Sequence, residues 1–291
     1  MKPAPFRYCR PADLGAALQA LADDPEAKVL AGGQSLVPLL SMRLAAPSML
    51  VDINGLPDLD QVRVGTDGVR VGALSRHSQV LACVQAAQVQ PLLCLAVAKV
   101  AHPTIRNRGT TVGSLVHADP AAELPAVLLV LGGTLTVAST SGRRTIAAGD
   151  LFAGPMESTL AHDEIAVEAF FPALPAGGGV AFDEVARRNG DYALCGIAVT
   201  MRLDGDRVVD ARAGYLSVAE VPTAVDLTVA LGGTVDSDAL GRAGEAALAV
   251  LDPQDDIHAT AAYRAQLVRV LTSRAVRAAY DDARARGRVD P

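Results

Sequence analysis

The sequence is poor in the side chains that bind metal ions. Its 291 residues include only four cysteines and five histidines. The cysteines form no Cys-x-x-Cys pair, and the histidines show neither His-x-x-x-His nor His-Glu-x-x-His spacing. Iron–sulfur clusters and structural zinc ions need clustered thiolate or imidazole ligands, so we expect no metal centre in this chain. The cysteines are then expected to be reduced and buried.

Long apolar runs are absent as well. The longest, residues 125–131, is far shorter than the roughly 20 residues of a membrane-spanning helix, and no secretion signal is visible at the N-terminus. We therefore expect a cytoplasmic protein. The net charge is -6, and the basic residues are scattered except in the C-terminal segment, where aspartates alternate with them. This balance argues against nucleic acid as the main partner, because phosphate neutralisation needs clustered positive charge.

No arrangement typical of nucleophilic catalysis is present either. The sequence contains no Gly-x-Ser-x-Gly motif and no cysteine paired with a suitable base. In such a chain the chemistry is expected to come from a bound cofactor, which the protein positions and tunes.

Two glycine-rich turns stand out against this background. The first, Leu30-Ala31-Gly32-Gly33-Gln34-Ser35, is expected between a strand at 27–31 and a helix at 36–44 with Ser35 as its N-cap. Its glycines allow close approach of a ligand, and the N–H groups of residues 33–36 are expected to converge on an anion. Taken alone, the turn also fits a strand-to-helix connection without a ligand. The Gly-x-Gly-x-x-Gly fingerprint of nicotinamide sites is absent.

The second turn is Arg108-Gly109-Thr110-Thr111-Val112-Gly113-Ser114, which offers three hydroxyl groups and the N–H groups around Gly113. Beyond it, Asp119 is suited to bind a polyhydroxyl chain such as ribityl, to cap a helix starting at Pro120, or to do both. His117 is either a cofactor contact or a buried hydrogen-bonded residue. Two such turns in one chain predict an extended dinucleotide held at two places.

The remaining pattern predicts three units. A strand at 49–53 completes the first, and a strand at 69–73, helices at 78–87, 91–100 and 120–131, and a hairpin at 134–147 belong to the second. A Pro- and Gly-rich linker at 172–179 precedes three antiparallel strands at 180–186, 194–203 and 208–218 and a long helix at 259–286. The expected boundaries are 1–57, 58–175 and 176–291.

Several segments resemble the FAD-binding medium subunit of molybdenum hydroxylases, the group of carbon monoxide, nicotine and xanthine dehydrogenases. They are Ala31-Gly-Gly-Gln-Ser-Leu-Val-Pro-Leu-Leu40, Val71-Gly-Ala-Leu-Ser-Arg-His77, His102-Pro-Thr-Ile-Arg-Asn-Arg-Gly-Thr110, His117-Ala-Asp-Pro-Ala-Ala-Glu-Leu-Pro125 and Glu184-Val-Ala-Arg-Arg-Asn-Gly-Asp-Tyr-Ala193. The resemblance implies an α+β fold. A vanillyl-alcohol-oxidase (PCMH)-type FAD-binding domain of two α/β subdomains is followed by a C-terminal domain with a three-stranded antiparallel sheet and helices.

The resemblance also implies a set of FAD-binding residues. They are Leu30, Ala31, Gly32, Gly33, Gln34, Ser35 and Leu36 in the first turn; Thr110, Thr111, Val112, Gly113 and Ser114 in the second; and His117, Asp119, Ala101, Leu160, Arg187 and Tyr192 around the rest of the flavin. Val112 stands where the family commonly has glycine. FAD binding is compatible with this change if residue 112 keeps a negative φ and uses its N–H group.

The resemblance further implies partner subunits. A large subunit would hold the molybdenum cofactor and oxidise the substrate, and a small subunit would carry two [2Fe-2S] clusters. This chain would collect the electrons on FAD and pass them to an external acceptor, and the usual assembly is a dimer of heterotrimers. Two alternatives remain: a self-contained FAD-dependent oxidoreductase of the same superfold, and a scaffold subunit that has lost FAD.

Overall fold

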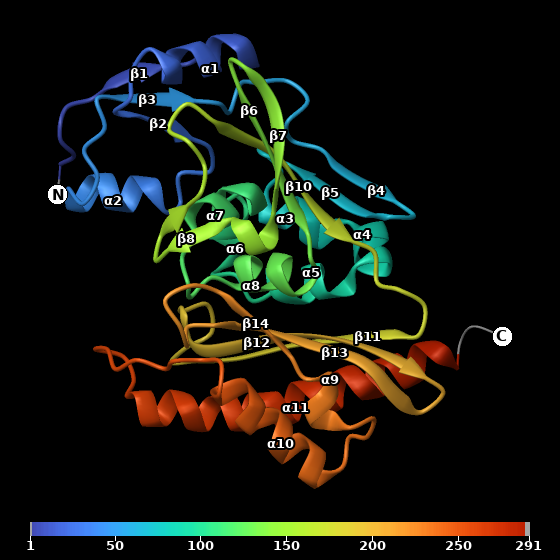
Figure 1. Cartoon of the computed structure of the whole chain (residues 1–291). Helices are drawn as coiled ribbons and strands as arrows, with labels where there is room; N and C mark the ends of the chain where they lie inside the picture. Colours follow the sequence, from blue (N-terminus) through green and yellow to red (C-terminus); the bar gives the residue numbers. More distant parts are fainter. Residues whose placement is uncertain (1, 289–291) are drawn as a thin grey trace.

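The computed structural model describes residues 2–288 and stacks three units in the order of the sequence (Figure 1). The N-terminal unit lies at one end, a middle unit of helices and an antiparallel sheet follows, and a C-terminal unit lies at the other end. The last strand of the middle unit ends at Pro172 and the first strand of the C-terminal unit begins at Gly178, so the connection coincides with the expected linker. The domain boundaries 1–57, 58–175 and 176–291 remain a prediction.

The N-terminal unit is a three-stranded parallel sheet in the order β1-β3-β2, with two helices. Strand β3 is buried along its whole length, as is typical of a parallel strand covered on both faces. Helix α1 begins where the Asp13 carboxylate accepts a hydrogen bond from the Ala16 N–H at 2.8 Å. The elements are β1 (Arg7–Cys9), α1 (Leu14–Ala22), β2 (Ala27–Leu30), α2 (Leu36–Met42) and β3 (Met49–Asp52).

The middle unit is built on a five-stranded antiparallel sheet in the order β4-β5-β10-β6-β7. The predicted hairpin is confirmed as β6 and β7, which pair from Thr134 opposite Ala147 to Ser139 opposite Gly142. The strands are β4 (Val62–Gly65), β5 (Gly68–Gly72), β6 (Thr134–Ser139), β7 (Gly142–Ala147) and β10 (Ile165–Pro172), with a small hairpin of β8 (Phe152–Gly154) and β9 (Glu157–Ser158). The helices are α3 (His77–Ala82), α4 (Val84–Val89), α5 (Pro91–Val97), α6 (Pro103–Arg106), α7 (Thr111–His117), α8 (Glu123–Val130) and the short 3-10 helix η1 (Ala148–Asp150).

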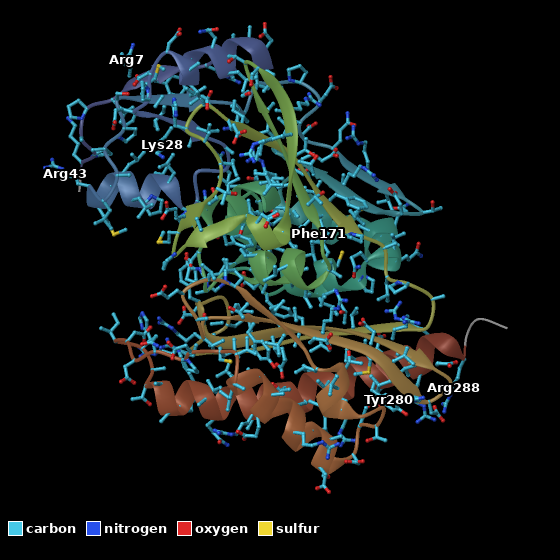
Figure 2. All side chains as sticks on the ribbon, viewed as in Figure 1. Arg7, Lys28, Arg43, Phe171, Tyr280 and Arg288 are labelled. Atoms are coloured by element: carbon cyan, nitrogen blue, oxygen red, sulfur yellow. The ribbon has the colours of Figure 1, made fainter. Side chains whose placement is uncertain are left out.

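One hydrophobic core extends through the N-terminal and middle units. It includes Val51 of β3, Leu92 of α5 and Phe171 of β10, all fully buried, and Figure 2 shows Phe171 within the middle unit. The shared core holds the first two units against each other. Each of these two units contributes one of the glycine-rich turns.

The C-terminal unit is an antiparallel sheet covered on both faces. Helix α11 packs against β11 and β12 on one face, while α8 of the middle unit packs against β12 and β13. A Cβ atom on Gly214 of β13 would lie 2.6 Å from the Ala126 carbonyl oxygen, so only glycine permits this approach of α8. The elements are β11 (Gly178–Ala186), β12 (Ala193–Asp204), β13 (Arg207–Leu216), β14 (Thr223–Asp226), α9 (Thr228–Leu231), α10 (Ser237–Leu248) and α11 (Ala261–Gly287).

Three local expectations need correction. The C-terminal sheet has four strands, because the short edge strand β14 pairs with β13 directly after Pro222, where four residues show too little periodicity to be recognised. Helix α8 begins at Glu123 instead of Pro120, because the Asp119 carboxylate accepts the Ala121 N–H at 2.8 Å in a preceding turn. The helix expected at 78–87 is divided into α3 and α4 at Cys83, whose backbone is extended.

No helix within residues 2–288 is long and apolar enough to cross a bilayer.

Candidate functional site

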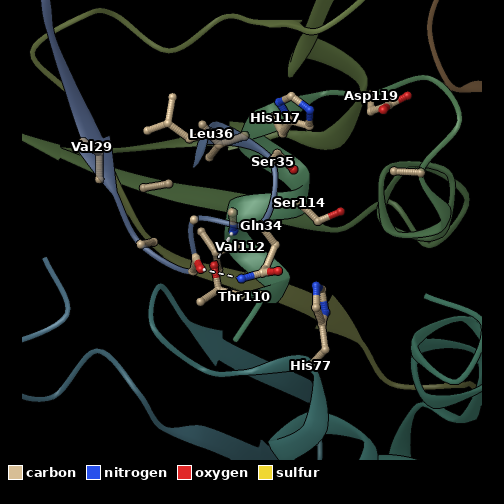
Figure 3. Close-up of a pocket in the computed structure, with 18 of the residues that line it drawn as sticks. Val29, Gln34, Ser35, Leu36, His77, Thr110, Val112, Ser114, His117 and Asp119 are labelled. Atoms are coloured by element: carbon tan, nitrogen blue, oxygen red, sulfur yellow. Dashed lines mark hydrogen bonds between the residues drawn. The ribbon is translucent and has the colours of Figure 1, made fainter. Parts of the chain in front are cut away.

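A cavity of about 600 Å³ lies between the N-terminal and middle units (Figure 3). Its wall combines the turn between β2 and α2, the start of α7 and the residues after α7. The C-terminal unit contributes the loop at 190–192. Most of the residues expected from the sequence meet here: Ala31, Gly32, Gly33, Gln34, Ser35, Leu36, Ala101, Thr110, Val112, Gly113, Ser114, His117, Asp119, Leu160 and Tyr192 all line this cavity.

The first turn touches the second through its backbone. Gly32 is buried, and a Cβ atom on it would lie 2.5 Å from the carbonyl oxygen of Arg108. Gly33 has a φ of 73°, a region that favours glycine. Ser35 holds the N-cap position of α2 and lines the cavity, and its side chain makes no capping hydrogen bond. The first N–H to bond within the helix is that of Val37, so the earlier N–H groups are available to a ligand.

The second turn is the first turn of helix α7. Thr110 is its N-cap, and its Oγ1 accepts the N–H of Gly113 at 3.1 Å. This bond corrects the expectation that the Gly113 N–H is free for a ligand. Val112 is the second residue of the helix, where the N–H has no intrahelical acceptor. It is not among the residues with positive φ, so it meets the condition under which its N–H can serve a diphosphate.

Three expected contacts lie outside the cavity wall. Leu30 ends β2, and its carbonyl oxygen accepts the N–H of Ile53 at 3.1 Å. Thr111 is fully buried, and its hydroxyl group lies 3.3 Å from Nδ1 of His77 instead of facing the cavity. Arg187 donates to the carbonyl oxygen of His258 at 3.0 Å, which directs it away from the cavity. In each case the expected contact group is close to, or hydrogen-bonded to, a residue of another segment, and a linear motif does not reveal that partner.

Residues that the motifs did not single out complete the wall. His77 is buried, and burial together with the charge of Arg106 lowers its pKa to about 4, so it is neutral at pH 7. Glu123 lines the cavity, and its burial raises its pKa to about 8, with Glu184 and Asp119 adding to the shift. Both residues occur inside the segments that carry the family resemblance, but their place in the wall depends on the fold.

The electrostatics of the cavity suit an anion at the turns. Two helix starts present N–H groups there, and the neighbouring His77 and Glu123 are uncharged near neutral pH. The rest of the wall includes apolar side chains such as Leu160 and Ile105. An extended molecule with a charged centre and flat apolar ends fits this distribution.

Comparison with known proteins identifies the family. Residues 4–174 match the model described as FAD binding domain in molybdopterin dehydrogenase, and residues 180–279 match that of the CO dehydrogenase flavoprotein C-terminal domain. The chain belongs to this flavoprotein family. It is the FAD-binding, medium type of subunit in oxidoreductases of the molybdenum hydroxylase group, as the sequence motifs predicted.

Individual relatives match this flavoprotein over nearly its whole length. The 6-hydroxypseudooxynicotine dehydrogenase complex subunit alpha of Paenarthrobacter nicotinovorans is 41% identical, over 98% of this chain and 97% of the relative. The carbon monoxide dehydrogenase medium chain of Hydrogenophaga pseudoflava is 33% identical, over 96% and 99%. The structure of quinoline 2-oxidoreductase from Pseudomonas putida 86 superposes with a TM-score of 0.91 at 37% identity, covering 97% of this chain and 99% of that chain.

Proposed function

We propose that this flavoprotein binds FAD in the cavity between its N-terminal and middle units. The observation that carries the proposal is the convergence of two helix starts on one cavity, with Gly32 allowing the turns to touch. When bound, FAD supplies the capacity to accept electrons and to release them to another acceptor. The protein residues bind it, orient it and exclude water from it.

The cavity suggests a division of roles among its residues. The N–H groups of the first turn and of Val112 bind the diphosphate, with the hydroxyl groups of Ser35 and Ser114 beside them. Asp119 and His117 are placed to meet the ribityl chain. Ala101 and Leu160 flank the flavin ring, and Tyr192 covers it from the C-terminal unit. Thr111 supports the second turn from behind through His77.

The proposal extends to partner subunits. Several relatives are named as medium subunits or chains, which implies larger and smaller companions. We propose a large partner with a molybdenum cofactor, where substrate is oxidised, and a small partner with two [2Fe-2S] clusters that deliver electrons to this chain. An external acceptor then receives the electrons, and the complex is a dimer of heterotrimers in the cytoplasm.

A visible absorption spectrum tests this function. The full chain is produced alone and also together with candidate large and small subunits, and each preparation is titrated with FAD. We expect the chain alone to bind one FAD, and we expect the complex to add the broad absorbance of iron–sulfur clusters. Reduction by an organic substrate should occur only in the complex.

Two outcomes would contradict the proposal. Bleaching of the flavin by a small substrate in the isolated chain would identify a self-contained oxidoreductase. A colourless chain that also fails to bind added FAD would identify a scaffold subunit.

A further inference from the structure

Arg76 connects the two glycine-rich turns from behind the cavity wall. Its Nη1 donates to the carbonyl oxygen of Arg108 at 2.6 Å, in the second turn. Its Nη2 donates to Oδ1 of Asn54 at 2.7 Å. Asn54 in turn donates from Nδ2 to the carbonyl oxygen of Ala31 at 2.8 Å, in the first turn. One side chain thus spans from the N-terminal unit to the middle unit.

Both ends of this connection are anchored. On the N-terminal side, Asp52 accepts hydrogen bonds from the Asn54 side chain at 2.6 Å and from the Tyr8 hydroxyl group at 2.5 Å. Burial opposes the charge of Asp52, but these bonds hold its pKa below the ordinary value, so it remains a carboxylate acceptor. The Asn54 amide therefore has a fixed orientation.

On the side of the middle unit, the backbone around Arg76 pairs with the second turn. The His77 N–H donates to the Gly109 carbonyl oxygen at 3.0 Å, and the Thr111 N–H donates to the Ser75 carbonyl oxygen at 3.3 Å. The backbone around Arg76 is thus fixed against the second turn, while its side chain binds Asn54, which in turn binds the first turn.

The chemistry of the guanidinium group suits this task. Its donors form a rigid planar fork, which fixes the separation of two acceptors in a way that the single ammonium of lysine does not. Within residues 2–288, Arg76 forms no ion pair with a carboxylate group. Arg76 therefore acts on two neutral oxygens, one on each unit, and not as half of a surface salt bridge.

We infer that Arg76 is the positioning residue that sets the spacing of the two FAD-binding turns. The inference rests on the proposed function, in which both turns hold one diphosphate. Hydrogen bonds to phosphate tolerate only a few tenths of an ångström, so the turns must be set at the right separation before FAD arrives. Arg76 does not itself line the cavity.

FAD titration of Arg76 variants of the full chain tests the inference. We expect Arg76→Ala to raise the Kd for FAD at least about tenfold, because two charged-donor hydrogen bonds are lost. Arg76→Lys keeps the charge and the apolar stem, is expected to fold, and should recover only part of the affinity. The control is Arg269→Ala, which removes an exposed ion pair with Glu245 in the C-terminal unit and should leave the Kd unchanged.

Amide hydrogen exchange without FAD separates positioning from general stability. Arg76→Ala should speed exchange in residues 31–36 and 109–114 while leaving strand β12 unchanged. An unchanged Kd in both Arg76 variants would overturn the inference, as would exchange that rises evenly along the chain. If the wild-type chain itself fails to bind FAD, the proposed function falls and the inference with it; wild-type binding with unaffected variants overturns the inference alone.

Discussion

Replacing Gly32 by alanine probes the contact on which the site depends. The added Cβ would lie 2.5 Å from the Arg108 carbonyl oxygen, 2.8 Å from Gly109 Cα and 3.0 Å from the Thr110 nitrogen. All three atoms belong to the backbone, so no side chain can turn aside to make room. Ordinary contact begins at 3.4 Å, so the second turn must retreat by nearly an ångström.

The size of the effect follows from this displacement. Forcing an atom into a packed contact typically costs about 1–3 kcal/mol of folding free energy. A retreat of that length also exceeds the tolerance of the hydrogen bonds that both turns would make to one diphosphate. Losing two such bonds, each worth about 1.5–3 kcal/mol with a charged partner, predicts a rise of at least about 100-fold in the Kd for FAD.

Thermal unfolding and FAD titration together measure both consequences. Gly241→Ala is the matched control, because Gly241 lies within α10 and the added Cβ would meet nothing within 4 Å beyond its chain neighbours and the backbone of its own helix. This control should bind FAD normally and gain up to about 1 kcal/mol, since alanine favours the helix over glycine. If Gly32→Ala binds FAD as tightly as the wild type and unfolds at the same temperature, the two turns are not in contact and the reasoning is refuted.

Three further predictions concern other parts of the chain. Val112→Ala should cost about 2 kcal/mol in urea denaturation, because Val112 is buried, yet keep bound FAD; loss of FAD would show that the side chain itself is needed. Burial raises the pKa of Glu184 to about 7, so the wild type loses stability as the pH rises from about 4.5 through 7. Glu184→Gln should therefore be more stable than the wild type by up to about 3 kcal/mol at pH 8, but not at pH 4. Equal urea midpoints of the two proteins at pH 8 would contradict this. Arg264→Ala removes bonds to the Leu194 and Gln254 carbonyl oxygens and to Asp256, and should cost about 3 kcal/mol in urea denaturation; a change below about 0.5 kcal/mol would argue against a structural role.

Local signals allowed much of the fold to be predicted. The turn between β2 and α2, the hairpin of β6 and β7, and the strands β11, β12 and β13 all follow from short-range patterns of apolar residues and glycines. The errors occur where local preference competes with a neighbour. Asp119 has the chemistry of a helix N-cap, but its carboxylate accepts the Ala121 N–H in a turn that precedes α8. The helix itself begins only at Glu123.

The candidate site was predicted unevenly for the same reason. Glycines and hydroxyl residues mark the two turns in the sequence, because close approach and anion binding require those residue types. Arg76 carries no such mark, since an arginine before a helix is usually solvated. Its importance arises from where Asn54 and Arg108 lie in space, and no spacing along the chain encodes that.

The sequence by itself determined the family, the cofactor class and the two turns, because these depend on residue types in short segments that must meet one chemical group. The tertiary structure decided which groups of those segments face the cavity. Thr111 was turned to His77, and the Gly113 N–H was taken by Thr110. The reason is physical: a backbone or hydroxyl group binds whichever partner the packed core brings within reach, and only the folded chain sets that choice.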